Sequence, residues 1–359
     1  MHFCILHLGK PCDGALLTTL SYSLDRMRLV PLIAALLLPA GLTPGATLDH
    51  SALRICQRPN ELSRSIMEND LLRDAKDGRL DECSLLEAAL VAGGSCDDTE
   101  ARELSVGFRD WARRTATLTF VEHDAAGSEK AQAQEIFEKL HNELLHGEYV
   151  ANCSDPAVTL RSGDFNCVTA TILYIEALRI AEIPAQSHAM VGHVFCRIGE
   201  GLDDVETTCP RWFRLSRHEA DEAAARVSRS RARARRNSRR LSDVELIAKI
   251  YYNRGVASFR CEDFEQGMLL TKRSLMLDSH DEVARGNVLA GLNNWGLFLC
   301  RQEEFAEASQ KFAELRKLDP EYATLAENEA HLYQLWEKQR SQQLQAGASE
   351  DRTPPGRGT

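Results

Sequence analysis

The sequence of 359 residues predicts an α+β domain followed by an all-α domain. The first observation is a stretch from Gly163 to Pro210, in which a cysteine precedes a helix-like run and two short strand-like runs follow. The second is a pair of segments after Leu241 that share one spacing of small and aromatic residues. An arginine-rich run between the two parts marks a domain boundary.

Composition narrows the classes of protein to consider. Hydrophobic residues make up 43% of the chain, as in ordinary soluble proteins, and aromatic residues make up only 6%, which favours a helix-rich architecture. The net charge of −10 argues against general nucleic-acid binding, because an acidic surface repels polyphosphate. Eleven cysteines are many for a cytosolic protein, so their pairing depends on the compartment.

Residues 1–46 are interpreted as a leader. After Met27-Arg28 comes an apolar run over residues 29–40, followed by small residues and turn formers up to Ala46, which is the pattern of a signal peptide. We therefore expect export to the periplasm or cell envelope, with Met27 as the true start. The run is short for a membrane span, which needs ~20 residues. The alternatives are an uncleaved anchor, which would give the only membrane contact, and a buried N-terminal helix.

The first domain is expected to cover residues 47–217 and to begin with polar, mixed sequence. From Glu82 to Arg114, apolar residues recur every three or four positions, and Gly93-Gly94 divides this pattern into two helices. Asp98 or Thr99 is expected to cap the second helix.

A further amphipathic helix is expected from Lys130 to Leu145. We expect these helices to pack as an N-terminal layer on the rest of the domain. His123, His141 and His146 are interpreted as surface or capping histidines.

The chemistry is expected at Cys167, which precedes a helix-like run over residues 168–182. The positive end of a helix dipole favours a thiolate, and exposed N–H groups there can hold an oxyanion. Asn166 is the neighbouring oxyanion or support residue, and Gly163 permits the tight turn that this placement needs. The alternative is an inert buried cysteine.

His193 opens the first strand-like run, and a turn at Gly199-Glu200-Gly201 leads into the second. With a two-residue loop, His193 lies opposite Glu206 as a cross-strand neighbour. Asp204 lies on the same face, one diagonal step away, so the choice between the two acids stays open. The carboxylate would orient the imidazole, and the imidazole would take the proton of Cys167.

A zinc site built from His188, His193, Cys196 and Cys209 is the metal alternative. These residues lack Cys-x-x-Cys spacing, and His193 and Cys196 point to opposite faces of a strand. We therefore expect no metal and no cofactor.

Residues 218–241 are interpreted as a charged linker. From Arg226 to Arg240 the chain has eight arginines in fifteen positions, which repel one another and favour an exposed linker or a solvated helix. The alternative is a contact with phosphate or anionic lipid.

Residues 242–345 are expected to form the helical domain. The first segment places Gly255, Phe264 and Gly267 at the spacing that the second gives to Gly296, Phe305 and Ala308, 41 residues later. This pattern resembles the tetratricopeptide repeat, a helical hairpin of 34 residues, with about seven extra residues between copies. A capping helix is expected over residues 322–344 and a disordered tail over residues 346–359. The two hairpins would either form a peptide-binding groove or buttress the first domain.

The runs Phe165-Asn166-Cys167-Val168, Gly192-His193-Val194-Phe195 and Val205-Glu206-Thr207-Thr208 resemble the transglutaminase-like superfamily. The closest likeness is to its bacterial SirB-type proteins, which place tetratricopeptide repeats after such a domain. The resemblance covers about residues 80–340. It implies a papain-like core with Cys167 as nucleophile, His193 as base and Glu206 as acid. Glu206 stands where the family usually has Asp, and Thr207 stands where it usually has Pro.

The resemblance implies a cysteine-nucleophile hydrolase or acyl transferase that acts on an amide or peptide bond, with repeats that bind a protein or peptide partner. The alternative is a non-catalytic scaffold that keeps the same shape and mediates protein–protein interaction. A third hypothesis is a regulatory or assembly factor that docks through residues 226–240.

Overall fold

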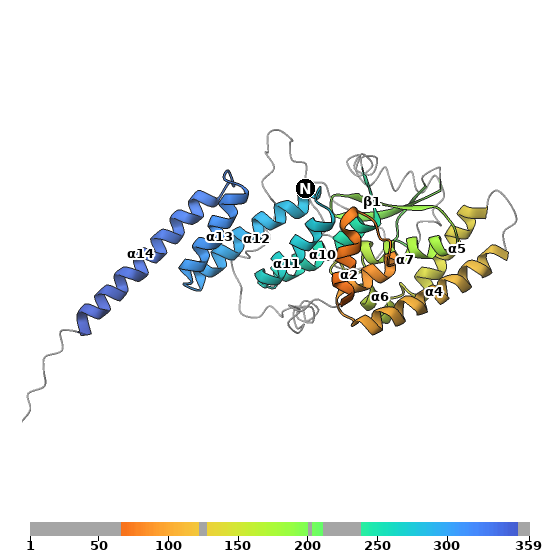
Figure 1. The fold of residues 1–359 in the computed structure, drawn as a ribbon, viewed down its shortest axis with the longest axis horizontal. Helices are drawn as coiled ribbons and strands as arrows, with labels where there is room; N and C mark the ends of the chain where they lie inside the picture. The colour runs from red at the N-terminus through yellow and green to blue at the C-terminus, as the bar shows by residue number, and fades with distance from the viewer. Residues whose placement is uncertain (1–65, 122–127, 200–202, 211–237, 351–359) are drawn as a thin grey trace, which may run out of the picture. The chain divides into compact units, whose positions relative to one another are not determined.

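The computed structural model describes residues 66–121, 128–199, 203–210 and 238–350 (Figure 1). These residues are mostly helical, with one four-stranded antiparallel sheet. The leader and residues 211–237, which include most of the arginine-rich run, lie outside the described residues. The elements are α2 (Ile66–Asp74), η1 (Ala75–Asp77), α3 (Leu85–Gly93), α4 (Asp98–Val121), α5 (Ser128–Glu143), α6 (Pro156–Ser162), α7 (Cys167–Ile180), β1 (Ala185–Met190), β2 (His193–Ile198), β3 (Asp203–Val205), β4 (Arg239–Leu241), α10 (Asp243–Arg260), α11 (Phe264–Leu277), α12 (Glu282–Arg301), α13 (Phe305–Leu318) and α14 (Leu325–Glu350).

The chain divides into two compact units. The first contains the described residues up to Arg254 together with Arg273–His280, and the second contains residues 255–272 and 281–350. The helical hairpin of α10 and α11 therefore contributes to both units.

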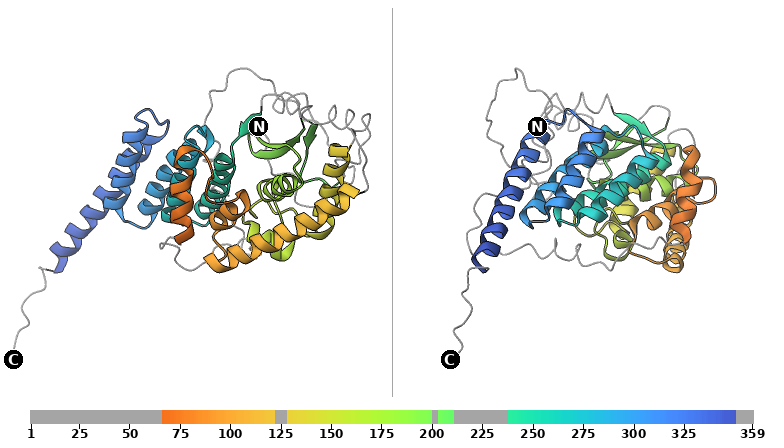
Figure 2. Two further views of the ribbon diagram at one scale, coloured as in Figure 1. Left: turned by 45° about the vertical axis from the view of Figure 1, so that its right-hand side comes forward. Right: turned by 60° about the vertical axis from the view of Figure 1, so that its left-hand side comes forward.

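The sheet of the first unit has the strand order β3-β2-β1-β4. β1 and β2 form a tight hairpin, in which Met190 pairs with His193 and Ala185 pairs with Ile198. The sequence pattern did not reveal β1, because Ala185–Met190 lacks a clear alternation of apolar and polar residues. Helix α7 lies against a face of this sheet (Figure 2).

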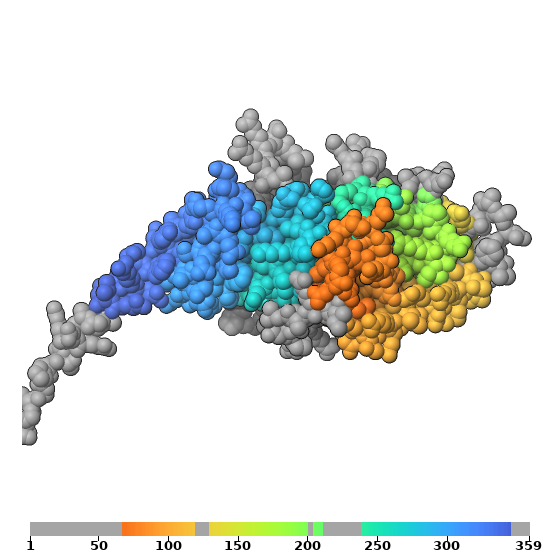
Figure 3. Space-filling view, viewed as in Figure 1, coloured from red at the N-terminus to blue at the C-terminus, as the bar shows by residue number. Residues whose placement is uncertain are grey.

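The N-terminal helices form the layer that the sequence predicted. Helices α3, α4 and α5 all contact α7, and α2 and α4 cover one face of the first unit (Figure 3). The expected break at Gly93-Gly94 ends α3. The cap of α4 was predicted wrongly, since Asp97 accepts the N–H groups of Thr99 and Glu100 at 2.9 Å. Helix α2 lies in the segment predicted to be only polar and mixed.

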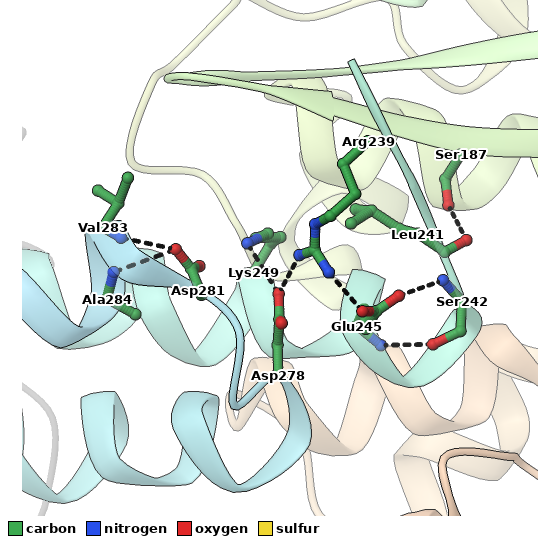
Figure 4. Close-up of polar contacts among 10 residues, drawn as sticks. All are labelled: Ser187, Arg239, Leu241, Ser242, Glu245, Lys249, Asp278, Asp281, Val283 and Ala284. Carbon is green, nitrogen blue, oxygen red and sulfur yellow. Dashed lines mark hydrogen bonds and ion pairs between the residues drawn. The ribbon is translucent and has the colours of Figure 1, made fainter. Parts of the chain in front are cut away.

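The end of the arginine-rich run is strand rather than linker, which corrects the prediction for residues 239–241 (Figure 4). Arg239 pairs with Glu245 and with the fully buried carboxylate of Asp278. Lys249 also pairs with Asp278, at 3.2 Å. A buried carboxylate needs such partners, so Asp278 fixes the position of β4 beside β1.

The two predicted helical hairpins repeat with the period read from the sequence. Helices α11 and α13 have 14 residues each and begin 41 residues apart, at Phe264 and Phe305. Glu262 and Glu303 take the same positive φ, about +60°, at the two hairpin turns. The extra residues lie in a longer helix rather than in a loop, since α12 has 20 residues.

Small residues let the helices of each hairpin approach closely, as predicted. A Cβ added at Gly255 would lie 2.4 Å from the Thr271 hydroxyl, and one added at Gly296 would lie 2.6 Å from the Phe312 ring. The final helix, α14, continues to Glu350, past Ala346, where the sequence pattern predicted the ordered part to end.

Candidate active site

Cys167 is the first residue of α7, and Asn166 caps the helix. The Asn166 side-chain oxygen accepts the N–H groups of Val168 and Thr169, at 2.9 and 3.1 Å. The Thr169 hydroxyl accepts the backbone N–H of Asn166 at 3.0 Å, which completes a capping box. The turn before the helix passes through Gly163, whose φ of +83° suits glycine. This local structure fixes the Cys167 side chain at the positive end of the helix.

Asn166 acts as a support in this arrangement. Its amide nitrogen donates to the carbonyl of Ala151 at 3.1 Å and to the Ser154 hydroxyl at 2.7 Å. The Asn253 amide donates to the same hydroxyl at 2.9 Å. The side-chain N–H groups of Asn166 are therefore committed. Cys167 also supplies a backbone N–H at the first position of α7, where helix N–H groups have no acceptor within the helix.

His193 joins the thiol to a carboxylate. Its Nε2 lies 2.9 and 2.8 Å from the two carboxylate oxygens of Glu206, and the side chain of Cys167 interacts with the same ring and raises its pKa. Since Nε2 faces Glu206, Nδ1 is the ring nitrogen available to the thiol. The structure thus brings together the three residues that the sequence singled out for catalysis.

The electrostatics of this group favour a charged imidazole. Burial lowers the pKa of His193, but hydrogen bonds to Cys167 and Glu206 and the negative charges of both outweigh burial and raise the pKa to about 10. His193 is therefore an imidazolium at neutral pH. Elsewhere in the first unit, burial raises the pKa of the Cys83 and Cys96 thiols to about 12 and that of the Cys153 thiol to about 11.

Glu206 reaches His193 in a register that differs from the predicted one. Cys196 pairs with Val205, so the turn between β2 and β3 is two residues longer than expected, and Glu206 follows the last strand pair. A shift of two residues keeps every side chain on its face, so the contact with His193 is diagonal. The Thr208 hydroxyl donates to Glu206 at 2.7 Å, a support that the sequence analysis did not identify.

Asp204, the alternative acid, lies elsewhere on this face. It stands directly opposite Arg197 and forms an ion pair with it at 2.5 Å. Arg197 also lies over the ring of Phe195, 5.4 Å from its centroid. Asp204 is thus part of a charge pair beside the site, and Glu206 is the carboxylate on the imidazole.

His141 was predicted to be a surface or capping histidine, and that prediction is wrong. The residue is only 7% exposed, and its ring lies edge-on to Phe137 and Phe165. Burial lowers the pKa of His141 to about 4, against a hydrogen bond to the backbone of Thr207 that raises it. His141 is therefore neutral, and Thr207, whose backbone it contacts, directly follows Glu206 in the chain. No local sequence signal marks this contact.

The residues considered for zinc are dispersed. His188 is buried, with Nδ1 3.4 Å from Arg197 and 3.3 Å from the Ser238 hydroxyl. Cys196 is buried on β2, where burial raises the pKa of its thiol. Across the described ranges, no group of three or more His, Cys, Asp or Glu side chains gathers as metal ligands would.

Comparisons of this chain with protein-family models, with curated proteins and with solved structures found no match. Within the described ranges, no helix has both the length and the apolar character that crossing a membrane requires.

Proposed function

We propose that this protein is a cysteine-nucleophile hydrolase or acyl transferase of the transglutaminase-like type, acting on an amide or peptide bond. Cys167 is the nucleophile, His193 the acid and base, and Glu206 the group that orients the imidazole. One observation carries the proposal: a single imidazole interacts with both a thiol at a helix N-terminus and a half-buried carboxylate. The packing of α7 on an antiparallel sheet supports a papain-like interpretation of this unit.

The proposed reaction begins with the Cys167 thiolate and the His193 imidazolium. The thiolate attacks the carbonyl carbon of the substrate, and the negative charge passes to the carbonyl oxygen, which the Cys167 N–H stabilises. The imidazolium gives its proton to the leaving amine, and the carbon–nitrogen bond breaks to leave a thioester on Cys167. His193, now neutral, takes a proton from water or from an acceptor amine as that molecule attacks the thioester. Cys167 leaves as a thiolate, and His193 is again an imidazolium.

Glu206 keeps this imidazole in place through both steps. Its two oxygens accept from Nε2, which leaves Nδ1 to face the thiol. The charge on Glu206 raises the pKa of His193 and so stabilises the imidazolium.

The test is the rate at which iodoacetamide labels each cysteine of the reduced protein between about pH 5 and pH 9, followed by peptide mapping. We expect Cys167 to react selectively at pH 6, and His193→Ala to remove that selectivity. His188→Ala is the matched control, because the ring of His188, like that of His193, stacks on Phe195. It should leave Cys167 reactive.

Labelling of Cys167 no faster than that of Cys83 or Cys96 in the native protein would contradict the proposal. The protein would then fit the alternative of a non-catalytic scaffold. In either case the repeated hairpins are proposed to bind a protein or peptide partner.

A further inference from the structure

His141 and Thr207 form a buried connection behind the proposed acid. His141 lies in the last turn of α5, where Phe137 and Phe165 surround its ring at centroid distances of 4.5 and 5.8 Å. Its ring hydrogen-bonds the backbone of Thr207. Helix α5 packs against α7. The contact of His141 with Thr207 therefore connects α5 to the segment that carries Glu206.

Thr207 is held from a second side by the nucleophile helix. Its hydroxyl lies 2.8 Å from the hydroxyl of Thr171, and both residues are fully buried. Thr171 is one turn along α7 from Cys167. The residue after Glu206 is therefore tied to α5 through its backbone and to α7 through its side chain.

Glu206 needs such an anchor because the strand does not position it. The last paired residue of β3 is Val205, and Glu206 lies just beyond it. Without strand pairing, a displacement of Thr207 would carry the Glu206 carboxylate away from Nε2 of His193, which it now meets at 2.8 Å.

We propose that His141 is a positioning residue: its uncharged ring holds Thr207 so that Glu206 stays bonded to His193. The proposal rests on the proposed function, since it assigns His141 a role in the same site. Burial lowers the pKa of His141 to about 4, so its ring keeps one protonation state throughout the neutral range. His141 touches no reacting atom and acts only through Thr207.

The test compares His141→Phe with His141→Gln in the full chain. Phe keeps a ring in the space between Phe137 and Phe165 but cannot form a hydrogen bond, whereas the Gln amide can still bond to the backbone of Thr207. The readouts are the pKa of His193, from an NMR titration, and the labelling rate of Cys167 at pH 6. We expect His141→Phe to lower the pKa of His193 by about 1 and to slow labelling about tenfold. His141→Gln should restore most of both.

Tyr174→Phe is the matched control. It removes a buried hydroxyl that donates to the carbonyl of Ala133 at 2.9 Å, so it also cuts a hydrogen bond between α7 and α5, away from Glu206. We expect a lower melting temperature in Tyr174→Phe with an unchanged pKa of His193. Should His141→Phe fail to fold, Thr171→Val loosens Thr207 from the other side and should lower the same pKa.

The positioning role is overturned by an unchanged His193 pKa in a folded His141→Phe protein, or by an equal change in Tyr174→Phe. Failure of the proposed function looks different. In that case Cys167 of the native protein labels slowly, while the effect of His141→Phe on the pKa of His193 still decides the role of His141.

Discussion

Helix α7 of the first unit and helix α12 of the second both contain many buried residues, but the two helices differ in which side chains pack against their neighbours. In α7, polar side chains such as Thr169, Thr171 and Glu176 are buried among apolar ones. In α12, glycine makes room for aromatic rings, as Gly296 does for Phe312. Burying a polar group costs free energy unless it finds a partner, whereas close packing of small and aromatic residues contributes stability directly. Since α12 also buries Asn287 and Asn293, the difference lies in what each helix accommodates: a capped thiol at the start of α7, and aromatic rings beside the glycines of α12.

The largest effect is expected from filling the space at Gly296. Gly296→Val should destabilise the protein by about 3 kcal/mol, because its side chain would overlap the Phe312 ring. Gly286→Ala, also in α12, adds a Cβ that meets nothing within 4 Å and should stabilise by about 0.5–1 kcal/mol. Chemical denaturation measures both. A large loss of stability in Gly286→Ala would contradict the open space beside Gly286.

The next effect concerns the two carboxylates beside β2. Glu206→Gln should slow the labelling of Cys167 at pH 6 by about 30-fold, roughly 2 kcal/mol, because the imidazolium loses its charged partner. Asp204→Asn should change the rate less than about twofold, since Asp204 pairs with Arg197. Equal effects of the two substitutions on the labelling rate would contradict the assignment of Glu206, rather than Asp204, as the partner of His193.

Two helix caps of the first unit separate stability from chemistry. Asn166→Ala and Ser84→Ala each remove a capping box and should each cost about 1 kcal/mol of stability. Only Asn166→Ala should also slow the labelling of Cys167, because only that cap positions the thiol. Thermal melts and labelling of the two variants, side by side, check this expectation. A slower rate in Ser84→Ala would show that any loss of stability affects the thiol.

The dependence of stability on pH gives a more gradual effect. The folded pKa of His193 lies above its unfolded value, so its contribution to stability is complete below about pH 6.5 and is lost as the pH rises towards about 10. The difference in free energy of unfolding between the native protein and His193→Gln should therefore shrink across that range. Denaturant titrations at several pH values measure it, and a difference that grows with pH has the wrong sign.

The sequence predicted the residues of the candidate site better than the geometry that supports them. Cys167, His193 and the pair of candidate acids, Glu206 and Asp204, could be predicted because strand parity and helix position depend on local sequence. The register was off by two residues, since the length of the turn after Ile198 cannot be read from Gly199 and Gly201.

Long-range partners account for the other differences. His141 is buried because α5 packs on α7, and β4 forms because Asp278 accepts Arg239. Neither contact leaves a pattern within its own segment. The repeated hairpins were clearer, because their spacing of small and aromatic residues is visible along the chain.

The most direct test of the central claim is an NMR titration of the His193 ring in the native protein and in Cys167→Ala. A single imidazole held between a thiolate and a carboxylate should stay charged to about pH 10 in the native protein. Its pKa should fall in Cys167→Ala, where one negative partner is gone. A His193 pKa near the ordinary value of ~6.5 in the native protein, unchanged in Cys167→Ala, would contradict the account.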